Sequence, residues 1–74
     1  MSEIKYSIDK EIGIISGEDS LWHLELNKVS WNGQKAKYDL RRWTDGHQKM
    51  SKGITLSEDE LLALRDFLNE MEVE

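Results

Sequence analysis

Residues 22–43 read WHLELNKVSWNGQKAKYDLRRW and contain two runs in which apolar and polar side chains alternate. Alternation of this kind is typical of strands with one buried face. Within the runs, the apolar residues that share a face are Leu24, Leu26, Tyr38 and Leu40. An Asn-Gly pair at 32–33 separates the runs and tolerates the positive φ angles of tight turns. The stretch therefore predicts an antiparallel hairpin.

Further strands are expected on both sides of this hairpin. An N-terminal strand is indicated by apolar residues that alternate with polar ones, namely Ile4, Tyr6 and Ile8. Residues 17–20 (GEDS) predict a turn before the hairpin, and the Asp-Gly pair at 45–46 predicts one after it. A fourth strand is expected near residues 54–56, with residues 49–53 leading into it.

A helix is expected at the C-terminal end of the chain. Residues 57–60 (SEDE) form a capping box, in which the Ser57 hydroxyl accepts from the Glu60 amide and the Glu60 carboxylate reaches back. After it, apolar residues recur at helical spacing in a stripe about 120° wide. We expect this stripe to form core or dimer contacts, and its members are Leu61, Leu64, Phe67, Leu68 and Met71. Leu62 lies off the stripe, as an exposed leucine or a further dimer contact.

The predicted fold class is α+β, with four antiparallel strands followed by one C-terminal helix. The helix covers one face of the sheet, and we expect that face to be the apolar one. The opposite face then carries Lys35, Lys37, Arg41 and Trp43. Trp31 joins that face only if the hairpin has a three-residue turn or a bulge, because a strict two-residue turn puts the strands out of phase.

The chain has 74 residues, without cysteine or proline, and we expect a single domain spanning 1–74. A core this small is marginal by itself and no disulfide can reinforce it, so we expect a homodimer. No apolar run has the length of a membrane span, and no secretory signal is apparent. The protein is expected to be cytoplasmic, with no membrane partner.

The charge is unevenly distributed along the chain. Residues 1–27 carry a net charge of −4 and residues 53–74 a net charge of −6, whereas residues 28–52 carry +5. A basic middle between acidic ends favours either an acidic partner or the pairing of unlike faces in a dimer.

Enzyme chemistry has little support in the sequence. The two histidines, His23 and His47, lie in no metal-ligand or triad spacing, and the glycines form no phosphate loop. We therefore expect no catalytic residues, no metal, no cofactor and no small-molecule substrate.

Basic and aromatic residues interleaved on one strand face favour binding of single-stranded nucleic acid. Trp31 and Trp43 are the expected base-stacking platforms. The expected phosphate contacts are Lys35, Lys37, Arg41, Lys49 and Lys52. Two alternatives use the same face: a protein–protein adaptor with tryptophan and arginine anchors, and a single-stranded RNA binder.

Residues 38–43 (YDLRRW), the Asp-Gly turn and residues 49–57 (KMSKGITLS) resemble the single-strand-binding domain of the transcriptional coactivator positive cofactor four. The short bacterial branch of that family, the YdbC-like proteins, is most similar, and the resemblance covers roughly residues 20–70. It implies a homodimer formed with help from the helix. It also implies largely sequence-independent binding of single-stranded DNA, with a possible use in transcription, replication or repair.

The resemblance carries over to individual positions. Arg41 matches the family's strand arginine, Lys52 the lysine before its Gly-Ile motif, and Lys49 an upstream lysine, across a loop one residue shorter. Trp43 matches one member of an aromatic pair, and Trp31 the region of a hairpin aromatic. Ser51 stands where the coactivator has a basic residue, and the coactivator's acidic, serine-rich tail is absent. Binding is therefore implied more strongly than coactivation.

Overall fold

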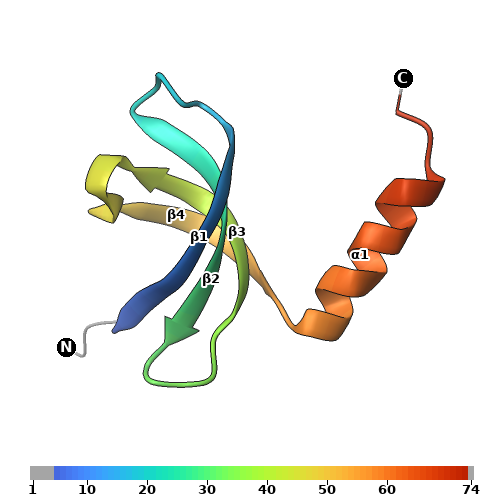
Figure 1. Ribbon diagram of the computed structural model, residues 1–74. Helices are drawn as coiled ribbons and strands as arrows, with labels where there is room; N and C mark the ends of the chain where they lie inside the picture. The colour runs from blue at the N-terminus through green and yellow to red at the C-terminus, as the bar shows by residue number, and fades with distance from the viewer. Residues whose placement is uncertain (1–4, 74) are drawn as a thin grey trace.

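The computed structural model describes residues 5–73, so Ile4 lies outside the described residues. Four strands pair antiparallel in the order β1-β2-β3-β4, and one helix follows them (Figure 1). The predicted α+β class is thus confirmed. The elements are β1 (Tyr6–Ser16), β2 (Trp22–Trp31), β3 (Lys37–Thr44), the 3-10 turn η1 (Asp45–His47), β4 (Met50–Leu56) and α1 (Glu58–Glu70).

The central hairpin contains the extra residue that its register requires. Asn32 and Gly33 adopt φ angles of 53° and 75°, and the Gln34 amide donates to the Trp31 carbonyl at 3.0 Å. The ladder begins with Val29 opposite Lys37, one residue later than a strict two-residue turn would give. Trp31 consequently shares a face with Arg41.

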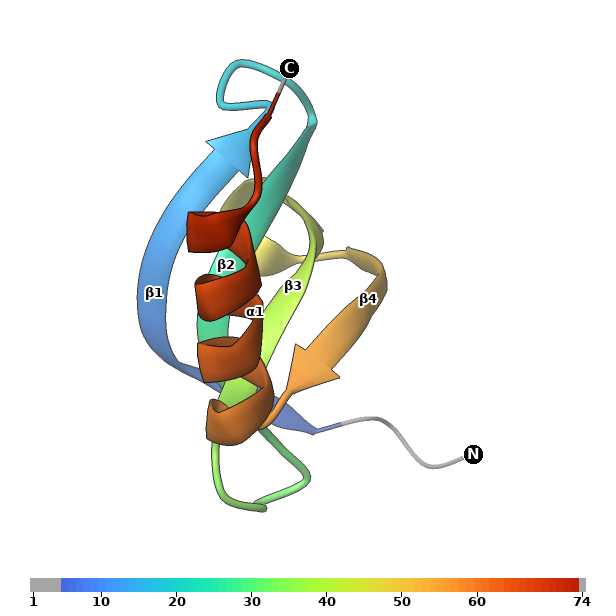
Figure 2. The same cartoon turned by 90° about the vertical axis from the view of Figure 1, so that its right-hand side faces the viewer.

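Strand β1 is longer and more irregular than its alternation suggests. Its pairing with β2 shifts register three times, and each shift leaves one extra residue on β1. These residues are Asp9, Ile12 and Ile15. Because a bulge bends a strand and increases its twist, β1 curves around the sheet instead of lying flat (Figure 2).

The two faces of the sheet differ in composition and burial. The inner face, turned away from α1, holds His23, Glu25, Asn27 and Val29 of β2 and Asp39, Arg41 and Trp43 of β3. All of these except Arg41 are buried, and Val29 and Trp43 are the buried hydrophobic residues among those described. The helix face holds Leu24, Leu26, Tyr38 and Leu40, as predicted.

Helix α1 begins at the predicted capping box. The Glu60 amide donates to Ser57 Oγ at 3.2 Å, and the Ser57 amide donates to Glu60 Oε1 at 2.8 Å. The pKa of the Glu60 carboxyl is lowered, first by its hydrogen bond with the Ser57 backbone and then by the Ser57 side chain. The box thus fixes the point at which the chain turns from β4 into the helix.

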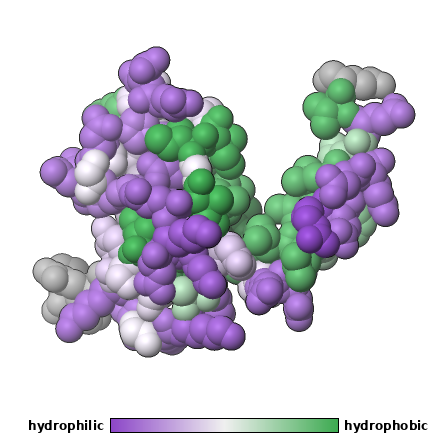
Figure 3. All heavy atoms as spheres, in the orientation of Figure 1, coloured by the Kyte–Doolittle hydropathy of each residue, from purple (hydrophilic) through white to green (hydrophobic). Residues whose placement is uncertain are grey.

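The apolar stripe of α1 faces the sheet but does not close on it. A hollow of about 320 Å³ lies between them, lined by apolar residues that include Leu26, Leu40, Leu56, Leu61, Leu64 and Leu68. Apolar surface therefore covers both walls of the space (Figure 3). No residue of α1 is buried, and Phe67 is 68% exposed. The stripe is thus not buried within the single chain, and the expected core or dimer contacts of its residues stay a prediction. Within residues 5–73, no helix is long and apolar enough to cross a bilayer.

Candidate functional site

An aromatic row crosses the inner face. Tyr6 of β1 lies between two tryptophans, with its ring centroid 5.7 Å from Trp31 and 5.4 Å from Trp43. The rings of His47 of η1 and Trp43 form a T-shaped pair with centroids 5.1 Å apart, and the Tyr6 hydroxyl donates to the His47 carbonyl at 3.0 Å. The row therefore joins β1, β2, β3 and η1 into one unit.

At one end of this row, Arg41 lies over the ring of Trp31. Its guanidinium carbon is 4.6 Å from the Trp31 centroid, within the range of a cation–π contact. Two of its nitrogens donate to the Asp39 carboxylate at 2.6 and 2.8 Å. Asp39 lies two residues earlier on the same face of β3, because side chains alternate along a strand. The Arg41 guanidinium thus contacts both the Trp31 ring and the Asp39 carboxylate.

An open groove of about 350 Å³ borders this surface, and its lining consists of Trp31, Asn32, Arg41, Met50 and Thr55. It combines an indole, a guanidinium and a thioether with two small polar side chains. Such a lining offers flat, polarisable contact area together with a few hydrogen-bonding groups. This chemistry suits a planar, partly polar ligand such as a nucleobase.

Trp43 differs from its predicted role as a platform. Its side chain is fully buried between Tyr6, His47 and the sheet, so its ring has no exposed face on which a base can stack in this structure. Its Nε1 finds no hydrogen-bond partner among the described residues. Trp43 is therefore a buried member of the aromatic row, and Trp31 is the tryptophan that borders the groove.

The four predicted lysines are all exposed, and the described part of the chain offers them no ion pair. Lys35 and Lys37 line a small hollow of about 140 Å³ beside Ser57 and Glu58, at the start of α1. Lys49 lines a different hollow, together with Trp22 and Asp45. The structure thus separates these cations into different hollows and does not bring them together at the groove.

Lys52 lies in a β-bulge of β4. Arg41 and Trp43 pair with Gly53 and Met50, which leaves Ser51 and Lys52 together opposite Arg42. The Arg42 amide donates to Ser51 Oγ at 3.1 Å, so the bulge is held by a side chain. Bulges redirect side chains and often border binding sites. This one lies next to the strand segment that carries Arg41.

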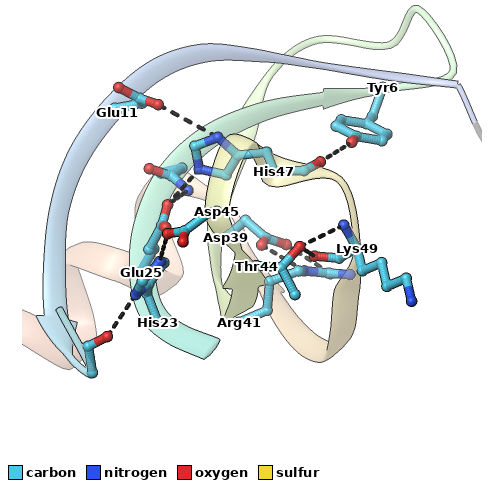
Figure 4. A network of polar contacts seen from close by, with 12 residues as sticks. Tyr6, Glu11, His23, Glu25, Asp39, Arg41, Thr44, Asp45, His47 and Lys49 are labelled. Carbon is cyan, nitrogen blue, oxygen red and sulfur yellow. Dashed lines mark hydrogen bonds and ion pairs between the residues drawn. The ribbon is translucent and has the colours of Figure 1, made fainter. Parts of the chain in front are cut away.

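At the other end of the aromatic row, two histidines bind acidic partners (Figure 4). His23 is buried, with Nδ1 2.5 Å from the Gly17 carbonyl oxygen and Nε2 2.6 Å from Asp45 Oδ1. Because a carbonyl oxygen only accepts, Nδ1–H is the donor to Gly17, and protonation of Nε2 adds a donor to the Asp45 carboxylate. The hydrogen bond to the Gly17 backbone, followed by that to Asp45, raises the pKa of His23.

The second histidine, His47, completes this network. Its Nε2 lies 2.7 Å from Glu25 Oε1, which also accepts from Asn27 Nδ2 at 3.0 Å, and its Nδ1 lies 3.6 Å from Glu11. A hollow of about 450 Å³ opens beside these residues, walled in part by Ile12 and Ile14 of β1. Together the two histidines tie the β1–β2 loop and η1 to the sheet.

Sequence reasoning missed Tyr6, Asp39, His47 and Met50 as parts of this arrangement. One signal was available: Asp39 and Arg41 are two residues apart on a strand, which places opposite charges on one face. The alternation of Tyr6 in β1 did not reveal that its ring would lie between two tryptophans. Tyr6 pairs with Trp31 across the β1–β2 ladder, and its contact with Trp43 joins segments far apart in the sequence, which no local pattern marks.

Two comparisons place the chain among known proteins. The model of the family described as Transcriptional Coactivator p15 (PC4) matches residues 19–67, from the first loop through most of α1. An uncharacterized protein of Treponema pallidum (strain Nichols) is 42% identical over 72 residues, which cover 97% of this chain and 85% of that protein. The matched region contains β2, β3, β4 and the groove residues.

Proposed function

The chain belongs to the Transcriptional Coactivator p15 (PC4) family, and we propose that it binds single-stranded DNA on the inner face of its sheet, with little sequence preference. The observation that carries the proposal is the groove beside the stacked Trp31 and Arg41. A base that stacks there contributes about 1–3 kcal/mol of binding energy, and every base has a face that can stack. We propose no catalytic role.

The exposed lysines supply the contacts to the phosphate backbone in this proposal. Lys52 lies in the bulge of β4, the strand that also contributes Met50 and Thr55 to the groove, whereas Lys35 and Lys37 lie toward α1 and Lys49 near η1. Each phosphate that is neutralised releases counterions, and binding weakens as salt rises. The acidic residues of α1 lie on a separate element. Their charge repels DNA, which favours the sheet as its binding surface.

We further propose that the protein acts as a homodimer in the cytoplasm. The support for a dimer is the unclosed hollow between the sheet and α1, with Leu64 39%, Leu68 54% and Met71 52% exposed. Covering such surface provides about 25 cal/mol for each Å² of apolar area removed from water. A second copy of the chain presents the same apolar stripe and can cover it symmetrically.

The test is fluorescence polarisation of a labelled oligothymidine of about 20 nucleotides, titrated at two salt concentrations with unlabelled duplex as competitor. Tight binding that salt weakens and duplex does not compete supports the proposal. An RNA oligonucleotide of matching sequence distinguishes a DNA binder from an RNA binder. Absence of binding at low salt contradicts the proposal and favours a protein partner for the basic residues.

Two variants assign the site. Trp31→Ala should weaken binding by about 1–3 kcal/mol, the contribution of one stacked base, without changing the salt dependence. Lys52→Ala should flatten the slope of log affinity against log salt by about one unit. Lys10→Ala is the matched control, because Lys10 is an exposed lysine of β1 that does not line the groove. Equal effects of Lys10 and Lys52 would remove Lys52 from the site.

A further inference from the structure

Asp39 is a fully buried carboxylate on the inner face, next to the groove. One of its oxygens accepts from Arg41 Nε at 2.6 Å, and the other accepts from Arg41 Nη2 at 2.8 Å and from Thr55 Oγ1 at 3.2 Å. Such a two-pronged arginine–carboxylate pair fixes the plane of the guanidinium as well as its position. Its partner Arg41 is nearly buried, with 12% of the side chain exposed.

Further contacts leave Arg41 little freedom to move. Its Nη1 lies 3.3 Å from Met50 Sδ and 3.4 Å from the Ser51 carbonyl oxygen. Its side chain also runs over Gly53, where an added Cβ would collide with Arg41 Cβ and the Leu40 carbonyl. The lack of a side chain at Gly53 thus gives Arg41 the space to lie flat across the sheet and over Trp31.

We propose that Asp39 is a positioning residue for nucleic-acid binding, which acts through Arg41 to hold the Trp31 ring in place. The inference rests on the proposed function and revises one part of the sequence-based expectation. In this role Arg41 is half of a neutral buried pair, and it contributes orientation and stacking surface instead of a phosphate contact. The charges that neutralise phosphates are then those of the exposed lysines alone.

This division of roles has a measurable electrostatic consequence. The salt dependence of binding counts the cations that replace counterions on the phosphates. Because the charge of Arg41 is already compensated by Asp39, the charge-neutral double variant Asp39→Asn/Arg41→Gln should lower the affinity for oligothymidine while leaving the salt slope unchanged. Lys52→Ala, by contrast, should flatten the salt slope of binding. If the double variant flattens the slope by about one unit, Arg41 is a phosphate contact and the inference is wrong.

The main test is Asp39→Asn in the full-length chain, with the affinity measured at two salt concentrations. The amide keeps the shape of the carboxylate, but only its oxygen can accept a hydrogen bond from Arg41, because its nitrogen is a donor. We expect the affinity for oligothymidine to fall about 5- to 150-fold, which corresponds to one lost stacked base. The double variant Asp39→Asn/Arg41→Gln should bind no more weakly than either single variant, because both act through one unit.

A spectroscopic readout separates positioning from a loss of folding. The indole N–H resonance of Trp31, assigned by its absence in Trp31→Phe, should shift in Asp39→Asn while the other two indole resonances stay in place. Gly53→Ala provides a second route, since its added Cβ shifts Arg41 and the adjoining β3–β4 pairing at Leu40 without changing any charge. It should weaken binding at an unchanged salt slope even if the Asp39 variant fails to fold.

The outcomes distinguish this inference from the proposed function. Wild-type protein that binds no oligothymidine at low salt would overturn both. Wild-type protein that binds, with Asp39→Asn and Gly53→Ala binding equally well, would overturn only the positioning role of Asp39. Additive losses in the double variant would also contradict it, because independent contacts add and a shared unit does not.

Discussion

The inner face of the sheet and its helix face differ in how far their side chains are buried and paired within the chain. On the inner face, polar side chains are buried and paired with one another, as in Asp39 with Arg41 and Glu25 with His47. On the helix face and on α1, apolar side chains remain in contact with solvent, as at Ile54 (58% exposed) and Leu68 (54%). The inner face is covered within the chain, and the helix face is left partly exposed.

The contrast shows that the periodic pattern of a strand identifies its two faces but not which of them is buried. Alternation in β2 separates His23, Glu25 and Asn27 from Leu24 and Leu26, and the polar set is the more buried one. The bulged β1 and the turn η1 cover the inner face, whereas α1 stands off the other. Full burial of a leucine contributes about 1.5–3 kcal/mol, so covering the helix face would add stability that the single chain lacks.

The largest expected effect tests the inner face. Trp43→Ala should destabilise the protein by about 3–5 kcal/mol, because it removes the most voluminous of the fully buried side chains and leaves a cavity. Chemical denaturation measures this directly.

Trp43→Phe is the control for Trp43→Ala. It keeps an aromatic ring and removes an indole N–H that has no partner in the described structure, so its cost should be smaller. Equal losses in the two variants would show that the indole N–H, and not the ring volume, matters at this position.

The next effect tests the uncovered face. Leu64→Ala should cost about 2–5 kcal/mol if a second copy covers the hollow that Leu64 lines. The melting temperature should then depend on protein concentration, and light scattering should report a dimer that the variant weakens.

Leu62 offers a closely matched control for Leu64. The two leucines are 38% and 39% exposed in the single chain, yet only Leu64 lines the hollow. Leu62→Ala should therefore have a much smaller effect. Similar effects from both substitutions, without dependence on concentration, would contradict a dimer through this surface.

The smallest effect sharpens the view of the inner face as a paired polar network. The pKa of His23 is raised above its ordinary value of 6.5 by the Gly17 carbonyl and Asp45. A raised pKa means that the folded state binds the proton more tightly than the unfolded state does. The stabilisation from His23 is therefore complete below about pH 6.5 and is lost as pH rises through the folded-state pKa.

Denaturation curves between pH 5 and pH 9 measure this trend, and both limits bracket the ordinary histidine range of about 6.5. His23→Gln should abolish the decline in stability that His23 produces over this interval. The groups that face His23 are Asp45 of η1, the Gly17 carbonyl of the β1–β2 loop and Glu25 of its own strand. If the wild-type and variant curves decline in parallel, another group titrates.

Local patterns predicted the fold well where the determinants are local. The Asn32-Gly33 turn, the alternation in β2 and β3, and the Ser57–Glu60 capping box all involve neighbouring residues, and all are present. The bulges of β1 were not predicted, because in the sequence Ile12 and Ile15 only interrupt the alternation of apolar and polar residues. A bulge is favoured by what the whole strand packs against, and that information lies elsewhere in the sequence.

The candidate site was predicted in part for the same reason. The sequence predicted Trp31 on the face of Arg41 on condition of a three-residue turn or a bulge, and the structure brings the two side chains into contact. It did not distinguish the two tryptophans, because the burial of Trp43 depends on Tyr6 and His47, which come from distant segments. The lysines could be counted from the sequence, but their separation around the sheet depends on strand twist and on the β4 bulge.

The three register shifts of β1 also bear on how the protein behaves at high concentration. β1 lies at one edge of the sheet, where unpaired amides and carbonyls can recruit a strand from another molecule. A straight, regular edge is the template on which fibrous aggregates grow, and repeated bulges interrupt that template. The bulges that allow β1 to curve around the sheet therefore also hinder pairing of its edge with the edge of another copy, in a chain that exposes several isoleucines.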